Sequence, residues 1–203
     1  MLFNPEYIIK PDAIDPAVCD LIIQKKDDED SFSPWKPARH GNPDATIKAE
    51  DQRSSSLKWA SPDHWTTALL ALETAKINAQ YWRFQITNQG PGQLALYQKN
   101  DHYAWHSDIG MDENGVRKVT IIAQLSDSDS YEGGDLELSY ISKNTEEGLA
   151  DEEERKLQIQ QAQDIRQKGT VIIFPCNLIH RVTPVTSGVR YSFTTTCLGP
   201  QLI

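Results

Sequence analysis

The sequence has few cysteines and no concentration of basic residues, and each shortage excludes a class of protein. The three cysteines are odd in number and form no C-x-x-C pair, so a disulfide framework is not expected. Lysine and arginine total 20 against 29 aspartate and glutamate residues, which makes the net charge −9. Because phosphate binding needs a concentrated positive surface, nucleic acid is not expected as a partner.

The sequence also lacks long apolar runs. No run approaches the ~20 residues that a membrane-spanning helix needs, so no membrane partner is expected. Residues 1–6 carry neither the basic stretch nor the apolar core of a secretory signal, which favours a cytoplasmic protein. With 203 residues and a hydrophobic content of 38%, the chain is expected to form one globular domain.

The order of the predicted elements indicates a mainly β protein with supporting helices. A strand over 7–10 and a helix capped by Asp15 come first, and a longer helix begins at 61–63. About eight short strands, separated by turn signals, follow in the rest of the chain. This pattern predicts a double-stranded β-helix, a cupin-like jelly roll, whose N-terminal helices pack on one sheet.

The single domain is expected to have two parts and one insertion. Residues 1–90 form helical support and outer strands, and residues 93–200 form the jelly-roll core. A charged insertion at about 140–167, with six acidic residues between 146 and 154, interrupts the core strands. The insertion is interpreted either as a solvated surface loop or as a mobile flap over a binding site.

Two local predictions depend on the pattern of side chains. Residues 81–86 are predicted as a strand. In the longer helix, six apolar side chains recur at helical spacing and are predicted to pack against a sheet: Trp65, Ala68, Leu69, Leu72, Ala75 and Ala79.

Three residues on predicted strands have the types and the spacing of a metal site. His106 and Asp108 lie two positions apart, which puts an imidazole and a carboxylate on one face of a β-strand. His180 follows the apolar strand over 171–175 and can supply a third ligand. Two histidines and one carboxylate leave other coordination positions open, which is the arrangement of non-haem Fe(II) oxygenases.

Arg190 is expected to face the same interior. It lies ten residues after His180, in a strand-like run over 189–194. An arginine that faces inward needs an anion beside it. By strand alternation, Ser192 and Thr194 share the face of Arg190.

Other residues near the motif are interpreted as structural. Tyr103 and Trp105 point opposite to His106 by alternation and are predicted to be packing residues. Cys176 lies four residues before His180, but a buried free cysteine is the preferred interpretation.

The segment from about 93 to 200 resembles the Fe(II)/2-oxoglutarate-dependent dioxygenases, specifically the prolyl-4-hydroxylase-like group with its bacterial and phage members. The H-x-D motif alone is weak, but its order and spacing with Gly-Gly, Phe-Pro, His and Arg are specific. The residues that carry the resemblance are Tyr97, His106-Ser107-Asp108, Tyr131 to Leu136, Gly169 to Pro175, His180 to Val185 and Gly188 to Ser192. The resemblance covers over half of the chain and implies the cytoplasm of a bacterium or of a phage-infected host.

The resemblance implies a role for each of these side chains. His106, Asp108 and His180 would bind Fe(II), and Arg190 would pair with the distal carboxylate of 2-oxoglutarate. Tyr97 resembles the strand tyrosine that lines the co-substrate pocket of this family.

Further contacts to the co-substrate are expected from three polar residues. Ser192 and Thr194 are candidates for an added hydroxyl contact. Related prolyl hydroxylases often carry a tyrosine in the strand that is here 119–124, and this sequence has none. Gln124 is therefore expected to make that polar contact. Collagen-type members usually carry lysine where this chain has Arg190, so it is similar to the arginine-using branch.

The implied reaction is hydroxylation of a C–H bond with release of succinate and CO2. Fe(II), 2-oxoglutarate and O2 are the implied cofactors, and ascorbate is a candidate reductant. A prolyl residue of a peptide or protein is the leading substrate, followed by a free amino acid or other small molecule, and the chain is expected to be a monomer or a homodimer.

Two other classes stay open. One is a zinc or other divalent-metal hydrolase or isomerase on a cupin-like jelly roll, although such an enzyme needs an acid or base beside the metal-bound water and none is marked. The other is a non-catalytic binding module, against which the intact set of three metal-binding residues argues.

Overall fold

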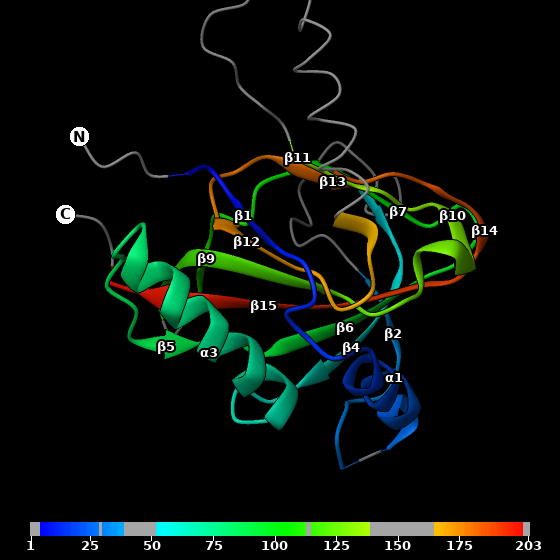
Figure 1. Cartoon of the computed structure of the whole chain (residues 1–203), viewed down its shortest axis with the longest axis horizontal. Helices are drawn as coiled ribbons and strands as arrows, with labels where there is room; N and C mark the ends of the chain where they lie inside the picture. The colour runs from blue at the N-terminus through cyan, green and yellow to red at the C-terminus, as the bar shows by residue number, and fades with distance from the viewer. Residues whose placement is uncertain (1–4, 29, 39–51, 113–114, 139–164, 201–203) are drawn as a thin grey trace, which may run out of the picture.

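The computed structural model describes residues 5–28, 30–38, 52–112, 115–138 and 165–200 (Figure 1). These residues form two main antiparallel sheets, with helices outside the larger one. The predicted jelly roll is therefore confirmed. The charged insertion predicted at about 140–167 lies almost entirely outside the described residues, so both of its interpretations stay predictions.

The larger sheet is built around two long strands, β9 (Gly115–Gln124) and β15 (Arg190–Gly199), which pair with each other. Across the sheet the strands lie in the order β1 (Ile8–Lys10), β12 (Val171–Pro175), β9, β15, β6 (Gly92–Tyr97), β4 (Ser56–Ala60) and β2 (Lys36–Pro37). Two short strands pair at the side, β5 (Asn88–Gln89) with β15 and β8 (Met111–Asp112) with β9.

The smaller sheet is drawn on one side of the larger sheet in Figure 1. Its strands lie in the order β11 (Leu136–Leu138), β13 (His180–Val182), β7 (His102–His106) and β3 (Arg53–Ser54). A separate ribbon pairs β10 (Tyr131–Gly133) with β14 (Val185–Gly188), and two short 3-10 helices are η1 (Lys25–Asp27) and η2 (Ser128–Ser130).

Alternate residues of the larger sheet belong to two different hydrophobic clusters. In β9, Ile121 and Ala123 pack in the cluster that includes the helices, whereas Ile122 packs in the cluster that includes the smaller sheet. In β12, Ile173 packs in the cluster that includes the helices, and Phe174 packs in the cluster that includes the smaller sheet. The period of two therefore gives the larger sheet a helix-covered face and an inner face toward the smaller sheet.

The helix that begins at Pro16 and the helix that begins at Trp65 cover the same face of the larger sheet, as predicted. Helix α1 (Pro16–Gln24) begins where the Asp15 carboxylate accepts a hydrogen bond from the Ala17 backbone N–H at 2.8 Å. Helix α3 (Trp65–Gln80) is the long helix in front of the sheet in Figure 1. No helix among the described residues is long and apolar enough to cross a membrane.

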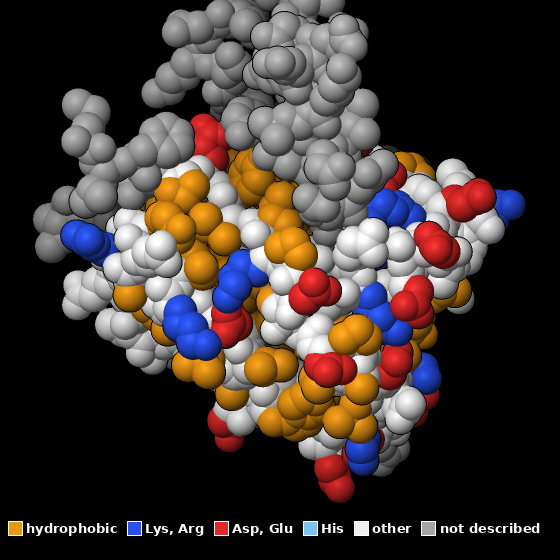
Figure 2. All heavy atoms as spheres, viewed as in Figure 1, with side chains coloured by type: hydrophobic (Ala, Val, Ile, Leu, Met, Phe, Trp, Pro, Cys, Tyr) orange, Lys and Arg blue, Asp and Glu red, His pale blue; other side chains and the backbone are white. Residues whose placement is uncertain are grey.

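Most of the apolar stripe predicted for α3 is wrong, because Leu69 is the one member of the six that packs against the core. Trp65 is 41% exposed and Leu72 is 56% exposed, whereas the buried face is Thr66, Thr67, Leu70, Thr74, Ile77 and Asn78. Threonine is tolerated there because its hydroxyl can be satisfied inside the helix: Thr74 donates to the Leu70 carbonyl at 3.0 Å. In the view that shows α1 and α3, hydrophobic side chains form several separate groups between charged ones (Figure 2).

The strand predicted over 81–86 is also wrong. This segment leaves α3 through Arg83, which has a positive φ of 57°. The Asn78 side chain accepts from the Phe84 backbone N–H at 2.9 Å and donates to the Phe84 carbonyl at 2.8 Å. One amide side chain therefore satisfies both backbone groups that a strand would have used for pairing.

Candidate metal centre and co-substrate cavity

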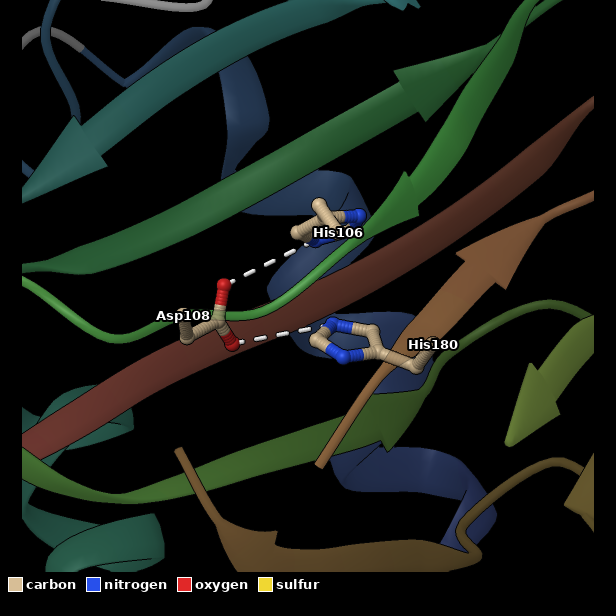
Figure 3. A group of neighbouring side chains, drawn as sticks. All are labelled: His106, Asp108 and His180. Carbon is tan, nitrogen blue, oxygen red and sulfur yellow. Dashed lines mark ion pairs between the residues drawn. The ribbon is translucent and has the colours of Figure 1, made fainter. Parts of the chain in front are cut away.

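The structure brings His106, Asp108 and His180 together (Figure 3). His106 is the last residue of β7, and His180, the first residue of β13, lies opposite it in the smaller sheet. The Asp108 carboxylate lies between the two rings, with each histidine Nε2 at 3.6 Å from one carboxylate oxygen. One ligand atom from each residue lies within 4.8 Å of the others, so the three side chains converge on a single point.

Backbone carbonyls orient both imidazoles for metal binding. Nδ1 of His106 lies 2.8 Å from the Ala104 carbonyl, and Nδ1 of His180 lies 3.0 Å from the Leu178 carbonyl. Because a carbonyl oxygen only accepts, each Nδ1 donates and each Nε2 keeps its lone pair for a metal. Burial, together with the neighbouring His180, lowers the pKa of His106 to about 4, which favours the neutral form that a metal ligand needs.

The carboxylate of Asp108 is oriented by the larger sheet. The Thr120 hydroxyl of β9 donates to Asp108 Oδ2 at 2.7 Å. The same hydroxyl lies 3.3 Å from the Cys176 sulfur, and burial raises the pKa of that thiol to about 12. Cys176 is thus a buried neutral thiol behind the site. The donor set therefore fits a divalent metal held by two imidazoles and one carboxylate.

Tyr103 was predicted to point away from His106, and this prediction is wrong. The rings of Tyr103 and His106 stack with their centroids 3.5 Å apart and their planes at 15°. In the pairing of β7 with β13, His106 lies opposite His180 but Tyr103 lies opposite Val182, so β7 carries one extra residue. This β-bulge breaks the alternation and turns Tyr103 to the same face as His106. Trp105 is 43% exposed and does not line the cavity.

A cavity of about 220 Å³ lies beside the three residues. This volume is below the ~300–1,000 Å³ usual for drug-sized ligands, so the cavity suits a small ligand. Its lining includes the three metal-binding candidates and four predicted co-substrate residues, Arg190, Tyr97, Ser192 and Thr194.

Arg190 is almost fully buried at one end of this cavity. Its side chain is 1% exposed, and its guanidinium lies 5.1 Å from the ring centroid of Tyr97. Nη2 donates to the Gln124 amide oxygen at 2.9 Å, but Nε and Nη1 have no hydrogen-bond partner among the described residues. A buried cation with two unused donors is costly unless an anion meets it. The carboxylate of a bound small acid would supply both missing partners.

Of the polar residues around Arg190, some line the cavity and one lies behind the guanidinium. Gln124 is buried and does not line the cavity, so it holds the guanidinium from behind. Ser192 and Thr194 line the cavity next to Arg190 on β15. Gly134, at a positive φ of 63°, lies against Arg190: a Cβ there would be 3.2 Å from Arg190 Cδ. A glycine is therefore needed where this turn meets the arginine.

Sequence reasoning missed two arginines that line the cavity, Arg53 and Arg117. Arg53 belongs to β3, and its guanidinium carbon lies 4.3 Å from the Tyr103 ring centroid. Its Nε donates to the Ser55 hydroxyl at 3.0 Å. Neither arginine lies in a recognisable motif, so the sequence carries no signal that would have identified it.

A jelly roll with two histidines, one carboxylate and a buried arginine around one cavity has the parts of a non-haem iron oxygenase. The family model of the 2OG-Fe(II) oxygenase superfamily matches residues 92–196, which is more than half of the chain. The chain belongs to this superfamily, and the resemblance inferred from the sequence is confirmed. The family's name states its two requirements, Fe(II) and 2-oxoglutarate.

Curated relatives share the same region. A PKHD-type hydroxylase of Synechococcus sp. (strain CC9605) is 35% identical over 99 residues, which cover 49% of this chain and 36% of the relative. A PKHD-type hydroxylase of Hyphomonas neptunium is 31% identical over 107 residues, covering 51% of this chain and 40% of the relative. The matches thus span about two fifths or less of the length of these relatives.

Solved structures share the fold over nearly the whole chain. A Pseudomonas putida prolyl-4-hydroxylase has a TM-score of 0.63 at 16% identity and covers 97% of this chain and 94% of its own. The viral collagen prolyl hydroxylase of Paramecium Bursaria Chlorella virus-1, solved with 2-oxoglutarate, has a TM-score of 0.62 at 17% identity, with 95% and 96% covered. A Trichoplax adhaerens prolyl hydroxylase, solved with a peptide fragment, has a TM-score of 0.62 at 16% identity, with 95% and 83% covered.

Proposed function

We propose that this protein is an Fe(II)- and 2-oxoglutarate-dependent dioxygenase that hydroxylates a C–H bond. The observation that carries the proposal is Arg190, a fully buried cation with two unpartnered donors in the cavity of the three metal-binding candidates. A dicarboxylate that chelates the metal at one end and meets Arg190 at the other satisfies both parts of this cavity.

Each side chain has a defined task in the proposed reaction. Nε2 of His106, Nε2 of His180 and the Asp108 carboxylate would hold Fe(II). When bound, Fe(II) and 2-oxoglutarate supply the oxidative chemistry, in which O2 oxidises the keto acid to succinate and CO2 and the substrate C–H bond is hydroxylated. Arg190 binds the distal carboxylate, and Tyr97 lines the same end.

The remaining walls position the reactants and exclude water. Thr120 fixes the Asp108 carboxylate, and Gln124 fixes the Arg190 guanidinium. Apolar side chains of both sheets, Ile122, Leu136 and Val182, line the cavity. Asp108 is the only carboxylate among its described lining residues, so a hydrolase that needs a free acid or base there is less well supported.

The leading substrate is a prolyl residue in a peptide or protein. The curated relatives are named hydroxylases, and the solved structures of the same fold are prolyl hydroxylases, one of them solved with a peptide. A free amino acid or other small molecule is the alternative. The cytoplasmic location, the use of ascorbate as reductant and the monomeric or homodimeric state stay predictions.

We also propose that the chain is one domain in which residues 1–90 support the core over 93–200. Strands β1, β2 and β4 extend the larger sheet, and β3 extends the smaller one. Helix α1 packs in the same hydrophobic cluster as the central strands, through Cys19 and Ile22. The N-terminal part therefore shares its core with the proposed catalytic part.

The test is succinate formation from 2-oxoglutarate with Fe(II) and O2, first without any substrate. Uncoupled turnover that requires both Fe(II) and O2 supports an oxygenase, whereas a hydrolase or a binding module gives none. A peptide and metabolite panel is then screened by mass spectrometry for products that gain one oxygen atom. A panel that includes prolyl peptides separates the leading substrate class from the small-molecule alternative.

A further inference from the structure

Arg117 lies at the opposite end of the cavity from Arg190. Arg190 is the first residue of β15, and Arg117 of β9 lies opposite Leu198 near the other end of β15. At ~3.3 Å per residue, these two positions are separated by ~26 Å along the strand. Between them Thr120, which donates to Asp108, lies opposite Thr196. The metal-binding candidates therefore lie between the two arginines.

A β-bulge turns Arg117 toward the cavity. Val119 lies opposite Cys197 and Arg117 lies opposite Leu198, so β9 carries one extra residue at Lys118. Without the bulge, alternation from Thr120 would point Lys118 into the cavity; instead, Arg117 lines it. Bulges often aim a side chain beside an active site.

Arg117 has one buried donor that the described residues do not satisfy. This donor is its Nε, which has no hydrogen-bond partner among the residues that the structure describes. Its Nη1 is 3.9 Å from the place where a Cβ on Gly110 would lie, so the glycine two residues after Asp108 leaves space beside the guanidinium.

The other missed arginine is already engaged. Arg53 donates to the Ser55 hydroxyl at 3.0 Å and lies over the Tyr103 ring. Its Nη2 also lies 3.5 Å from the Tyr97 hydroxyl. Arg53 is thus held as part of the wall, whereas Arg117 keeps an unused buried donor.

The charge of the cavity also favours a second anion. Three arginines and one carboxylate are among its described lining residues. The charges of Fe(II) and of 2-oxoglutarate cancel each other, so two positive charges remain when both are bound.

We propose that Arg117 binds a carboxylate of the prime substrate, so that this enzyme selects substrates with an acidic group near the oxidised carbon. This inference rests on the proposed function and names the substrate class of the same site. A 2-oxoglutarate molecule that spans the metal and Arg190 does not extend to Arg117, so the anion at Arg117 belongs to another molecule. It is either an aspartate or glutamate beside the target residue of a peptide or the α-carboxylate of a free amino acid.

The test compares ligands that differ only in one charged group. Short prolyl peptides with Asp or Glu on either side of proline are compared with the same peptides carrying Asn or Gln. L-proline is compared with L-prolinamide. Binding to protein loaded with Mn(II) and 2-oxoglutarate, without O2, is measured by calorimetry. We expect at least one carboxylate ligand to bind about 10- to 100-fold more tightly than its amide counterpart, which is the strength of a charge-assisted hydrogen bond. The pair that shows the difference identifies a peptide or a free amino acid.

Arg117→Gln should remove the difference in affinity between the carboxylate ligand and its amide counterpart. The amide counterpart and 2-oxoglutarate should bind this variant with wild-type affinity. Arg117→Lys, which keeps the charge, should retain part of the preference. Arg83→Gln is the matched control, because Arg83 is exposed on the loop after α3 and lies outside the cavity.

Three results would overturn the proposal. They are no preference for any carboxylate ligand in the wild type, a preference that persists in Arg117→Gln, and a change in 2-oxoglutarate affinity in Arg117→Gln. Uncoupled succinate formation is measured on the same samples. If the wild type forms succinate but shows no carboxylate preference, only the Arg117 inference fails, whereas absence of succinate formation contradicts the proposed function itself.

Discussion

The two ends of the cavity are built in different ways. At the Arg190 end, Arg190, Ser192 and Thr194 follow the regular alternation of β15, and Gln124 and Gly134 fix the arginine from behind. At the Arg117 end, a bulge in β9 sets the direction of the side chain, and Nε is left without a partner. The first end is preorganised for one small dicarboxylate, whereas the second presents an arginine with an unused donor to an incoming molecule.

The largest effect is expected from removing the centre between the two ends. His106→Ala or Asp108→Ala should abolish succinate formation, with and without substrate, because each change removes a metal ligand and little core volume. Metal content and circular dichroism check that binding is lost while the fold persists. Activity like that of the wild type in either variant contradicts the assignment of the three ligands.

Arg190→Ala tests the preorganised end. We expect the 2-oxoglutarate concentration needed for half-maximal turnover to rise by about two to three decades. Leaving a buried carboxylate unpaired costs roughly 3–5 kcal/mol, and ~1.4 kcal/mol is tenfold. Arg190→Met, which keeps most of the side-chain volume, controls for loss of packing, and Arg83→Ala controls for loss of charge. An unchanged dependence on 2-oxoglutarate would mean that another residue holds its distal carboxylate.

Thr120→Val tests the support of the metal centre from the larger sheet. The change keeps the shape of the side chain but removes the hydrogen bond to Asp108 Oδ2. We expect the affinity for Fe(II), or for Mn(II) as its substitute, to fall by about 10- to 100-fold, as for other residues that orient metal ligands. Metal titration measures this directly, and Thr120→Ser, which keeps the hydroxyl, should remain close to the wild type.

The smallest effect is expected from Gln124→Leu, which tests whether the Arg190 end of the cavity can be changed without affecting the Arg117 end. It removes the acceptor for Arg190 Nη2, so the guanidinium loses its fixed orientation but keeps its charge. The 2-oxoglutarate requirement should rise by about tenfold, in line with one hydrogen bond to a charged group. The carboxylate preference attributed to Arg117 should stay unchanged. A parallel loss of both would show that the ends are not independent.

Regular alternation was the part of the site that sequence reasoning predicted well. The inward face of Arg190, shared by Ser192 and Thr194, follows from a period of two in β15. The H-x-D motif and His180 also meet at this cavity, but Asp108 lies two residues beyond the end of β7, so the predicted strand alternation does not place it. The jelly roll followed from the count and order of short strands after two helices. These features depend on local geometry that each strand specifies for itself.

Two secondary-structure predictions failed because a polar side chain took a place that the sequence pattern gives to an apolar side chain or to a strand partner. The buried face of α3 contains Thr67 and Thr74, because small threonines fit close to the sheet: a Cβ on Gly92 of β6 would lie 2.6 Å from the Thr67 hydroxyl. Asn78 likewise took the hydrogen bonds of Phe84 that a strand over 81–86 would have used. Hydrophobic periodicity carries no information about buried polar side chains such as Thr74 and Asn78, whose hydrogen bonds are made locally.

The sequence by itself determined the H-x-D motif, the position of His180 and the inward-facing Arg190, the residues that we propose hold the metal and the co-substrate. Only the tertiary structure decided that Tyr103 stacks on His106 and that Arg117 lines the far end of the cavity. Both depend on a β-bulge, and a bulge is defined by how two strands pair. One extra residue moves every following side chain to the other face, and the register that sets its place exists only between partners distant in the chain.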